Sequence, residues 1–180
     1  MIIDDFTTGP HRAELLSGED RDTQSGTGIL GGFRNTWIGF ISSPFGTPVR
    51  FDIGSTGLIL ATGPGASHRL ELVYGKKDWT EAAPLNLNLA PFRALRLRFS
   101  SNDLPLAFNI YLSTETSSGP ATFNWATHIN IPFGHIDIPL TDLRRLGAEA
   151  DLSNIDYIWL IFFPALFGSN DYVIKSFEAV

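Results

Sequence analysis

The sequence contains no cysteine, and this absence excludes every site that depends on a thiol. Disulfide frameworks, zinc–thiolate centres, iron–sulfur clusters and cysteine nucleophiles all need that residue. Because a chain without cysteine survives in oxidising and in reducing compartments, the absence does not indicate where the protein acts.

Charge is also scarce, since only 18% of the residues are charged and the formal net charge is −6. The sequence has no stripe of lysine and arginine, which argues against a polyanionic nucleic-acid partner. A mildly acidic chain suits a neutral ligand or a divalent cation instead. Long apolar runs are missing as well. The longest, at residues 158–163, is far too short to span a bilayer, so no membrane span is expected.

Residues 1–5 lack the basic and apolar regions of a secretion signal. We therefore expect a cytoplasmic protein, or an extracellular one if a signal has been removed.

Phenylalanine and glycine are abundant, with 14 and 17 copies, and this composition favours strands joined by tight turns. Short apolar segments recur between clusters of Gly, Pro, Asn, Asp and Ser, as in all-β chains. We predict one domain over residues 1–180, an antiparallel jelly-roll β-sandwich of two sheets, with a closed barrel as the alternative. The predicted strands are residues 2–7, 33–41, 49–53, 57–62, 68–75, 95–100, 106–114, 121–131, 135–138, 155–163 and 172–179.

Evidence for a helix is limited to residues 140–147, where Thr141 or Asp142 could cap the start and Gly147 could end it. At most one short helix is therefore expected. Residues 17–32 are rich in Gly, Ser, Thr and Asp, which predicts a long loop there.

Three predicted strands, at 95–99, 108–113 and 122–131, alternate clearly enough to assign their faces. If they are neighbours, one sheet has an apolar inner face and a polar outer face that could grip sugar hydroxyls. A solvated face with cross-strand polar pairs explains the same pattern. A tryptophan in a nearby polar loop could serve as a ligand platform or as a lid over the sandwich edge. The candidate ligand-binding residues are Arg96, Arg98, Asn109, Tyr111, Asn124, His128 and this loop residue, Trp79.

The other three tryptophans have apolar neighbours and are expected in the core: Trp37, Trp125 and Trp159. Residues 155–163 are apolar on both faces, which predicts a central strand covered on both sides.

Several local motifs resemble those of bacterial jelly-roll domains of the galactose-binding-like superfamily. They are an Asp-Phe pair at 5–6, a Gly-Gly pair at 31–32, the segment 87–97, and the C-terminal segments 138–143, 151–158 and 171–174. The resemblance covers most of the chain and implies a fold more than a function. The superfamily includes carbohydrate-binding modules, bacterial surface proteins and calcium-dependent cyclases. One departure is Lys175-Ser176, where relatives often carry Asp-Asn.

Acidic residues cluster in the first predicted strand and the polar segment after it, and one more lies near the C-terminus. The terminal strands of such jelly rolls pair, which would bring Asp4 close to Glu178. Calcium takes roughly six to eight oxygen ligands, and a flexible acidic loop can supply several. Ordinary surface acids explain the cluster as well, and Arg21 opposes a cation. The candidate calcium ligands are Asp4, Asp5, Glu19, Asp20, Asp22 and Glu178.

No catalytic residue is assigned, because the sequence has no Gly-x-Ser-x-Gly, His-Glu-x-x-His or phosphate-loop motif. His135 and Asp137 share a strand face, but such a pair is more often an ordinary surface pair than an acid–base couple.

Three hypotheses for function follow. The first is a non-catalytic module that binds carbohydrate or another small molecule, or that assembles with copies of itself into a homo-oligomer. The second is a cyclase or isomerase acting on a small molecule in an apolar, aromatic pocket. The third is a structural subunit of a fibre or shell, for which the apolar segment 162–168 would supply a contact.

Overall fold

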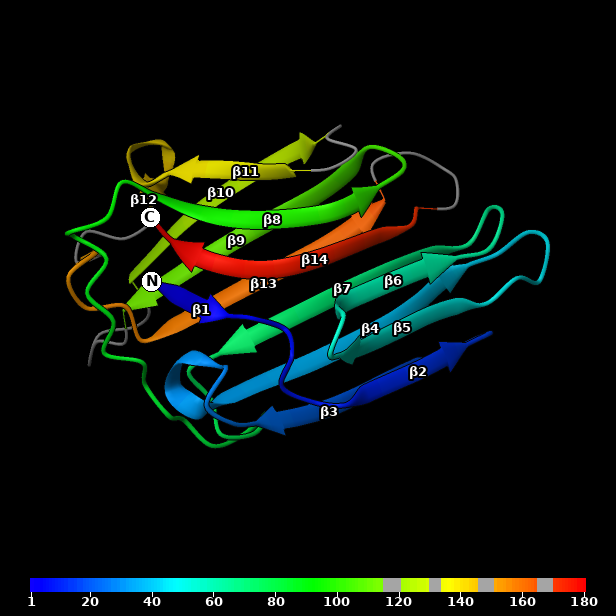
Figure 1. Ribbon diagram of the computed structural model, residues 1–180, viewed down its shortest axis with the longest axis horizontal. Coiled ribbons are helices and arrows are strands. Elements are labelled where there is room, and N and C mark those ends of the chain that lie inside the picture. The colour runs from blue at the N-terminus through cyan, green and yellow to red at the C-terminus, as the bar shows by residue number, and fades with distance from the viewer. Residues whose placement is uncertain (115–120, 130–133, 146–150, 165–169) are drawn as a thin grey trace.

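Two antiparallel sheets of seven strands each pack into a sandwich (Figure 1). The computed structural model describes residues 1–114, 121–129, 134–145, 151–164 and 170–180, without the side chains of 121–129. No α-helix occurs in these residues, and the helical segments found there are two three-residue 3-10 turns, Leu30–Gly32 and Leu140–Asp142. The prediction of an all-β, two-sheet sandwich is therefore confirmed.

Sheet A has the strand order β11-β8-β14-β6-β5-β2, and β1 pairs with β14 beside this path. The pairing of β1 with β14 brings the two chain ends together. The amino group of Met1 donates a 2.6 Å hydrogen bond to the carbonyl of Ala179. The strands of sheet A are β1 (Ile2–Asp4), β2 (His11–Leu15), β5 (Val49–Gly54), β6 (Gly57–Thr62), β8 (Ala94–Asn102), β11 (Gly134–Pro139) and β14 (Tyr172–Ala179).

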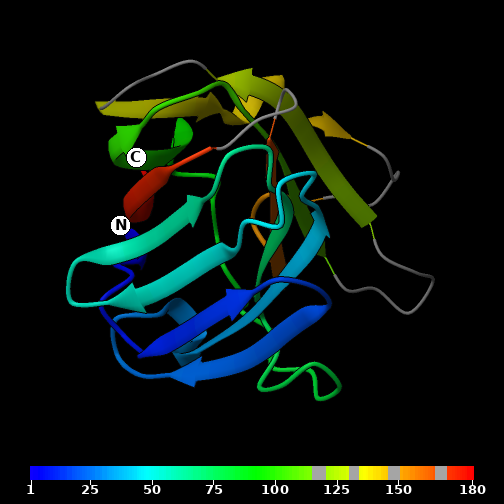
Figure 2. The same ribbon diagram turned by 90° about the vertical axis from the view of Figure 1, so that its right-hand side faces the viewer.

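Sheet B has the order β12-β10-β9-β13-β7-β4-β3. Most connections cross from one sheet to the other, as at β4–β5 and β6–β7, whose turns lie together at the end of the sandwich seen in Figure 2. The strands of sheet B are β3 (Glu19–Ser25), β4 (Phe33–Ser42), β7 (Ser67–Tyr74), β9 (Leu106–Thr114), β10 (Ala121–Ile129), β12 (Arg144–Arg145) and β13 (Tyr157–Pro164).

The core lies between the sheets and follows from the two-residue period of the strands. In β9, Phe108, Ile110 and Leu112 point inward and are fully buried. Phe108 stacks on Phe162 of β13, with ring centroids 5.6 Å apart, and Phe162 in turn contacts Tyr172 from sheet A. Burial of each large apolar side chain of this kind contributes roughly 1.5–3 kcal/mol.

A buried polar network replaces apolar packing beside β1. Both carboxylate oxygens of Asp4 accept hydrogen bonds from Arg34, and one also accepts a 2.8 Å bond from the hydroxyl of Tyr74. Arg34 Nε donates to the side-chain oxygen of Gln24, which Thr36 also contacts. Burial raises the pKa of the Asp4 carboxyl, and the adjacent guanidinium opposes that shift. The network ties β1 to sheet B.

This network explains why the predicted loop at 17–32 is wrong in part. Residues 19–25 form β3, and its inward residue Gln24 is only 5% exposed. Because the inner face of β3 is polar, the strand shows no apolar alternation in the sequence.

Two further expectations need correction. The predicted helix at 140–147 is a 3-10 turn followed by β12, while 146–147 lie outside the described residues. The predicted apolar loop at 162–168 begins inside β13, where Phe162 is part of the core, and 165–168 also lie outside the described residues.

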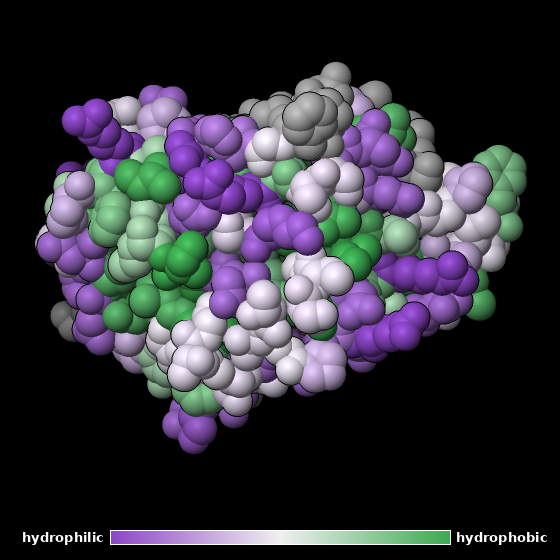
Figure 3. All heavy atoms as spheres, in the orientation of Figure 1, coloured by the Kyte–Doolittle hydropathy of each residue, from purple (hydrophilic) through white to green (hydrophobic). Residues whose placement is uncertain are grey.

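The outer face of sheet A is charged but compensated. Arg96 and Arg98 of β8 point outward and pair with Asp137 and Glu178, each at 2.6 Å. Hydrophilic residues gather over β8 and β14 on this face (Figure 3). The hydrogen bond from Arg96 lowers the pKa of the Asp137 carboxyl, which favours its charged form.

Among the described residues, no helix is long and apolar enough to cross a membrane.

Candidate functional site

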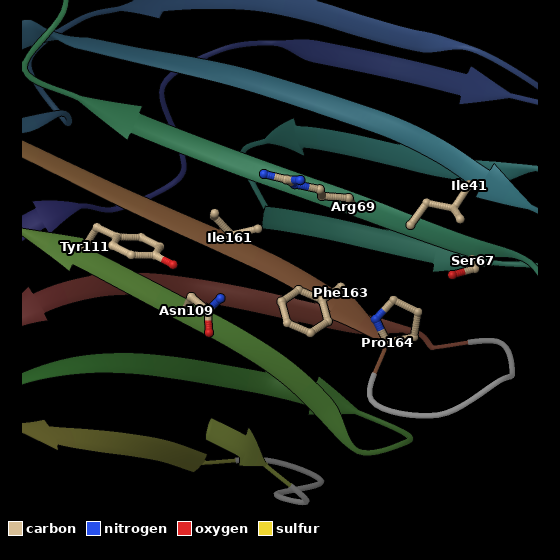
Figure 4. A pocket seen from close by; sticks show the side chains of 8 residues that line it. All are labelled: Ile41, Ser67, Arg69, Asn109, Tyr111, Ile161, Phe163 and Pro164. Atoms are coloured by element: carbon tan, nitrogen blue, oxygen red, sulfur yellow. The ribbon is translucent and has the colours of Figure 1, made fainter. Parts of the chain in front are cut away.

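The outer face of sheet B carries an open groove of about 510 Å³ (Figure 4). This volume falls within the usual range for small-molecule sites, roughly 300–1,000 Å³. Four strands, β4, β7, β13 and β9, contribute to it or end at its rim, and polar and apolar side chains alternate around it. The lining residues are Ile41, Ser67, Arg69, Asn109, Tyr111, Ile161, Phe163 and Pro164.

Strand register brings these side chains to one face. In β9, Asn109 and Tyr111 point outward because their neighbours fill the core. Ile161 of β13 lies directly opposite Asn109 on one side and Glu71 of β7 on the other. Side chains at such paired positions lie roughly 4.5–5.5 Å apart at Cβ. The groove floor is therefore continuous across three strands.

Apolar side chains on the outward face of β13 form much of this floor. The sequence pattern predicted a strand covered on both faces, but the outer side of β13 faces the groove and solvent. Trp159, expected in the core, points outward and is 38% exposed. The solvent-facing side of a sheet usually carries polar residues. Apolar residues grouped on such a face mark a surface suited to a partner or ligand.

A chain of contacts links the aromatic side chains around the groove. The rings of Tyr111 and Trp159 lie 5.6 Å apart, and the indole nitrogen of Trp159 donates a 3.0 Å hydrogen bond to Glu71. Glu71 also pairs with Arg69 at 2.7 Å. The guanidinium of Arg69 lies 5.8 Å from the ring centroid of Trp37, in cation–π geometry.

Trp37 lies flat against its own strand on this face. Its ring lies over Gly39, where a Cβ atom would collide with the indole. Any larger residue at position 39 would therefore displace the indole. Trp37 is half-buried on the outer face, whereas the sequence predicted it in the core.

Asn109 and Tyr111 are the predicted ligand residues that line the groove. On the neighbouring strand, register places Asn124 opposite Tyr111 and His128 opposite Ala107, and the side chains of that strand are not described.

Trp79 is half-buried in the loop after β7, with the guanidinium of Arg21 5.6 Å from its ring centroid. Arg21 is the register partner of Trp37, so Trp79 lies at the β3 edge of the same sheet.

Arg96 and Arg98 do not share this face. The expectation of one polar face over all three strands is wrong, because the chain crosses between sheets after β8 and places β8 in sheet A and β9 in sheet B. Alternation reports which residues of one strand point together, but it does not report which sheet the strand joins.

The six candidate calcium ligands do not converge in the described structure. The predicted pairing of the terminal strands is present, but Asp4 points into the core and Glu178 points outward. Within the described residues, no group of three or more His, Asp or Glu side chains could hold a metal ion. The carboxylates instead contact Arg34 for Asp4, Thr7 for Asp5, Arg21 for Glu19, His11 for Asp20, Gln24 for Asp22 and Arg98 for Glu178. Calcium binding stays a prediction, and this set does not fit it.

The groove also contains residues that sequence reasoning missed, chiefly Arg69 and Ile161. One signal for the groove was present in the sequence. The segment that forms β13 is apolar on both faces, whereas a strand with one face in solvent usually has polar residues on that face.

The protein is therefore a two-sheet jelly roll with an open groove on the outer face of one sheet. No protein-family model matches the sequence, and no curated protein is significantly similar to it. Among solved structures, the solution structure of CtCBM11 aligns with a TM-score of 0.50 and 15% identity, over 100% of this chain and 94% of that one.

Two more solved structures align less well. The family 11 carbohydrate-binding module of the cellulase Lic26A-Cel5E of Clostridium thermocellum gives a TM-score of 0.48 at 14% identity, over 100% of this chain and 93% of that one. The family 11 xylanase of Neocallimastix patriciarum gives 0.46 at 8% identity, over 96% and 99%. At such identities the likeness concerns the fold: the chain is a jelly-roll domain of the type seen in carbohydrate-binding modules.

Proposed function

We propose that the protein is a non-catalytic module that binds a carbohydrate chain in the groove of sheet B. The observation that carries this proposal is the combination of Tyr111 with Asn109 and Arg69 in one open groove. Sugars present apolar C–H faces and many hydroxyl groups, so a sugar site needs an aromatic platform next to planar hydrogen-bonding groups. The carbohydrate-binding-module fold supports the same function but does not establish it.

The shape of the groove favours a polymer over an enclosed substrate. The groove is open to solvent, and the lining residues that the structure describes include no carboxylate. A cyclase would need a carboxylate or another acid within reach of a pocket that excludes water. An open groove instead leaves a bound sugar chain in contact with solvent, as a polymer ligand requires.

Affinity electrophoresis against soluble polysaccharides tests the proposal. The panel consists of mixed-linkage β-glucan, xylan and galactomannan as neutral polymers, with bovine serum albumin as the non-binding reference. Wild type should be retarded by at least one of them. The Tyr111→Ala variant should lose that retardation, because the platform of the groove is removed.

Arg98→Ala is the matched control, because Arg98 lies on the outer face of the other sheet and pairs with Glu178 there. It should be retarded like wild type. Equal loss of retardation in both variants, or no retardation of wild type by any polymer, would count against the groove as a carbohydrate site.

A further inference from the structure

Glu71 is an acidic residue that does not line the groove itself but contacts Arg69, which does. Both of its oxygens are engaged: Oε1 pairs with Arg69 Nη2 at 2.7 Å, and Oε2 accepts the 3.0 Å hydrogen bond from Trp159 Nε1. Its side chain is only 12% exposed, whereas that of Arg69 is 43% exposed. The carboxylate is therefore covered by the two groups that it contacts, while the guanidinium is open to the groove.

Among the described residues that line the groove, Arg69 is the only charged one. The carboxylate of Glu71 beside it offsets the positive charge of this guanidinium, so the pair presents no net charge to a ligand. A free guanidinium at this position would present a planar fork that matches the carboxylate of a uronic acid. The charge preference of the groove thus depends on a residue that does not line it.

Strand geometry makes this arrangement specific. Arg69 and Glu71 are two residues apart on β7 and share its outward face, and Ile161 lies directly opposite Glu71. The guanidinium is held from the other side by the ring of Trp37 at 5.8 Å. The arginine is therefore fixed between an aromatic ring and a carboxylate, and cannot swing freely toward a ligand.

We propose that Glu71 sets the charge preference of the groove. By neutralising Arg69, it makes the groove select neutral polysaccharides over polysaccharides that contain uronic acids. This inference rests on the proposed function of the groove. It predicts that removing the charge of Glu71, without removing its bulk, converts a neutral groove into a cationic one.

The test compares one neutral polymer, the member of the panel that retards wild type, with one acidic polymer, polygalacturonate, for wild type and the Glu71→Gln variant. The ratio of acidic to neutral affinity should rise by at least about tenfold in Glu71→Gln, because the guanidinium of Arg69 can then form a hydrogen-bonded ion pair with a carboxylate of the ligand. The gain should disappear at high ionic strength.

The double variant Arg69→Gln/Glu71→Gln removes both charges and should return the ratio to the wild-type value. A purely structural role for Glu71 would lower both affinities together and would not be reversed by the second substitution. Glu14→Gln, which disrupts an exposed pair with Arg50 on the other sheet, is the control and should leave the ratio unchanged.

The outcomes separate the two claims. If wild type binds a neutral polymer of the panel but Glu71→Gln shows no gain for polygalacturonate, this inference is wrong and the groove proposal stands. If wild type binds no neutral polymer of the wider panel, the groove proposal and this inference both fail.

Discussion

Arg34 and Asp4 form an ion pair at 2.7 Å in which neither side chain is exposed to solvent. The pair joins the N-terminal strand to sheet B and is completed by the hydroxyl of Tyr74, 2.8 Å from the carboxylate. Few domains bury an arginine so completely, because removing a guanidinium from water is costly unless each donor finds an acceptor. Here the acceptors are Asp4, Gln24 and the carbonyl of Thr8.

Replacing Arg34 by methionine should lower the free energy of unfolding by about 3–5 kcal/mol, because Asp4 is left as an unpaired buried charge. Urea denaturation followed by circular dichroism measures the change. The double variant Asp4→Asn/Arg34→Met should recover part of the loss. Arg50→Met, which removes an exposed pair with Glu14, should change stability by less than about 1 kcal/mol. Equal losses for Arg34→Met and Arg50→Met would show that the buried network does not stabilise the fold.

His68 should make stability depend on pH. It is buried between the sheets, with Nε2 3.3 Å from the hydroxyl of Tyr172, and burial lowers its pKa to about 3. In the unfolded chain its pKa is about 6.5. Between these values the unfolded state binds a proton that the folded state does not. The free energy of unfolding should therefore fall as pH drops from about 6.5 toward 3, by up to about 1.4 kcal/mol per pH unit.

His68→Gln removes this contribution, so its stability should vary less with pH across that window than that of wild type. Chemical denaturation at a series of pH values measures the slopes. His135→Gln provides the control, because the His135 side chain is 46% exposed. Identical slopes for wild type and His68→Gln would contradict a neutral, buried His68.

Gly39→Ala should disturb the groove more than the fold. The added methyl group collides with the ring of Trp37, which must move and release the guanidinium of Arg69. We expect a changed near-ultraviolet circular dichroism spectrum and weaker retention by the polysaccharide that wild type binds. Gly54→Ala, at a strand glycine where the nearest atom is 3.7 Å from the added Cβ, should leave both unchanged. An unaltered tryptophan spectrum in Gly39→Ala would mean that the indole does not rest on Gly39.

The strands of the core were predictable because their apolar residues alternate. The alternation in residues 108–113 places Asn109 and Tyr111 outward, as the structure does. Short polar strands escaped prediction. The inward-facing residue Gln24 of β3 is polar, and its partners Arg34 and Thr36 lie on β4. A single sequence does not reveal such pairing between strands.

The groove itself was predictable in part. Outward polar residues on 108–113 were visible, but the sheet to which each strand belongs was not. That assignment depends on where short connections such as residues 103–105 cross between layers. The sequence therefore grouped Arg96 and Arg98 with residues of the other sheet. It missed Arg69, whose role depends on its contacts with Glu71 and Trp37.

A residue-resolved nuclear magnetic resonance titration tests the central claim most directly. Isotope-labelled protein is titrated with an oligosaccharide of the polymer that retards it in the electrophoresis assay. The account predicts that the amide shifts that change most belong to Arg69, Asn109, Tyr111 and Ile161 on sheet B. Shifts concentrated instead around Arg96, Arg98 and Glu178 on sheet A would contradict it.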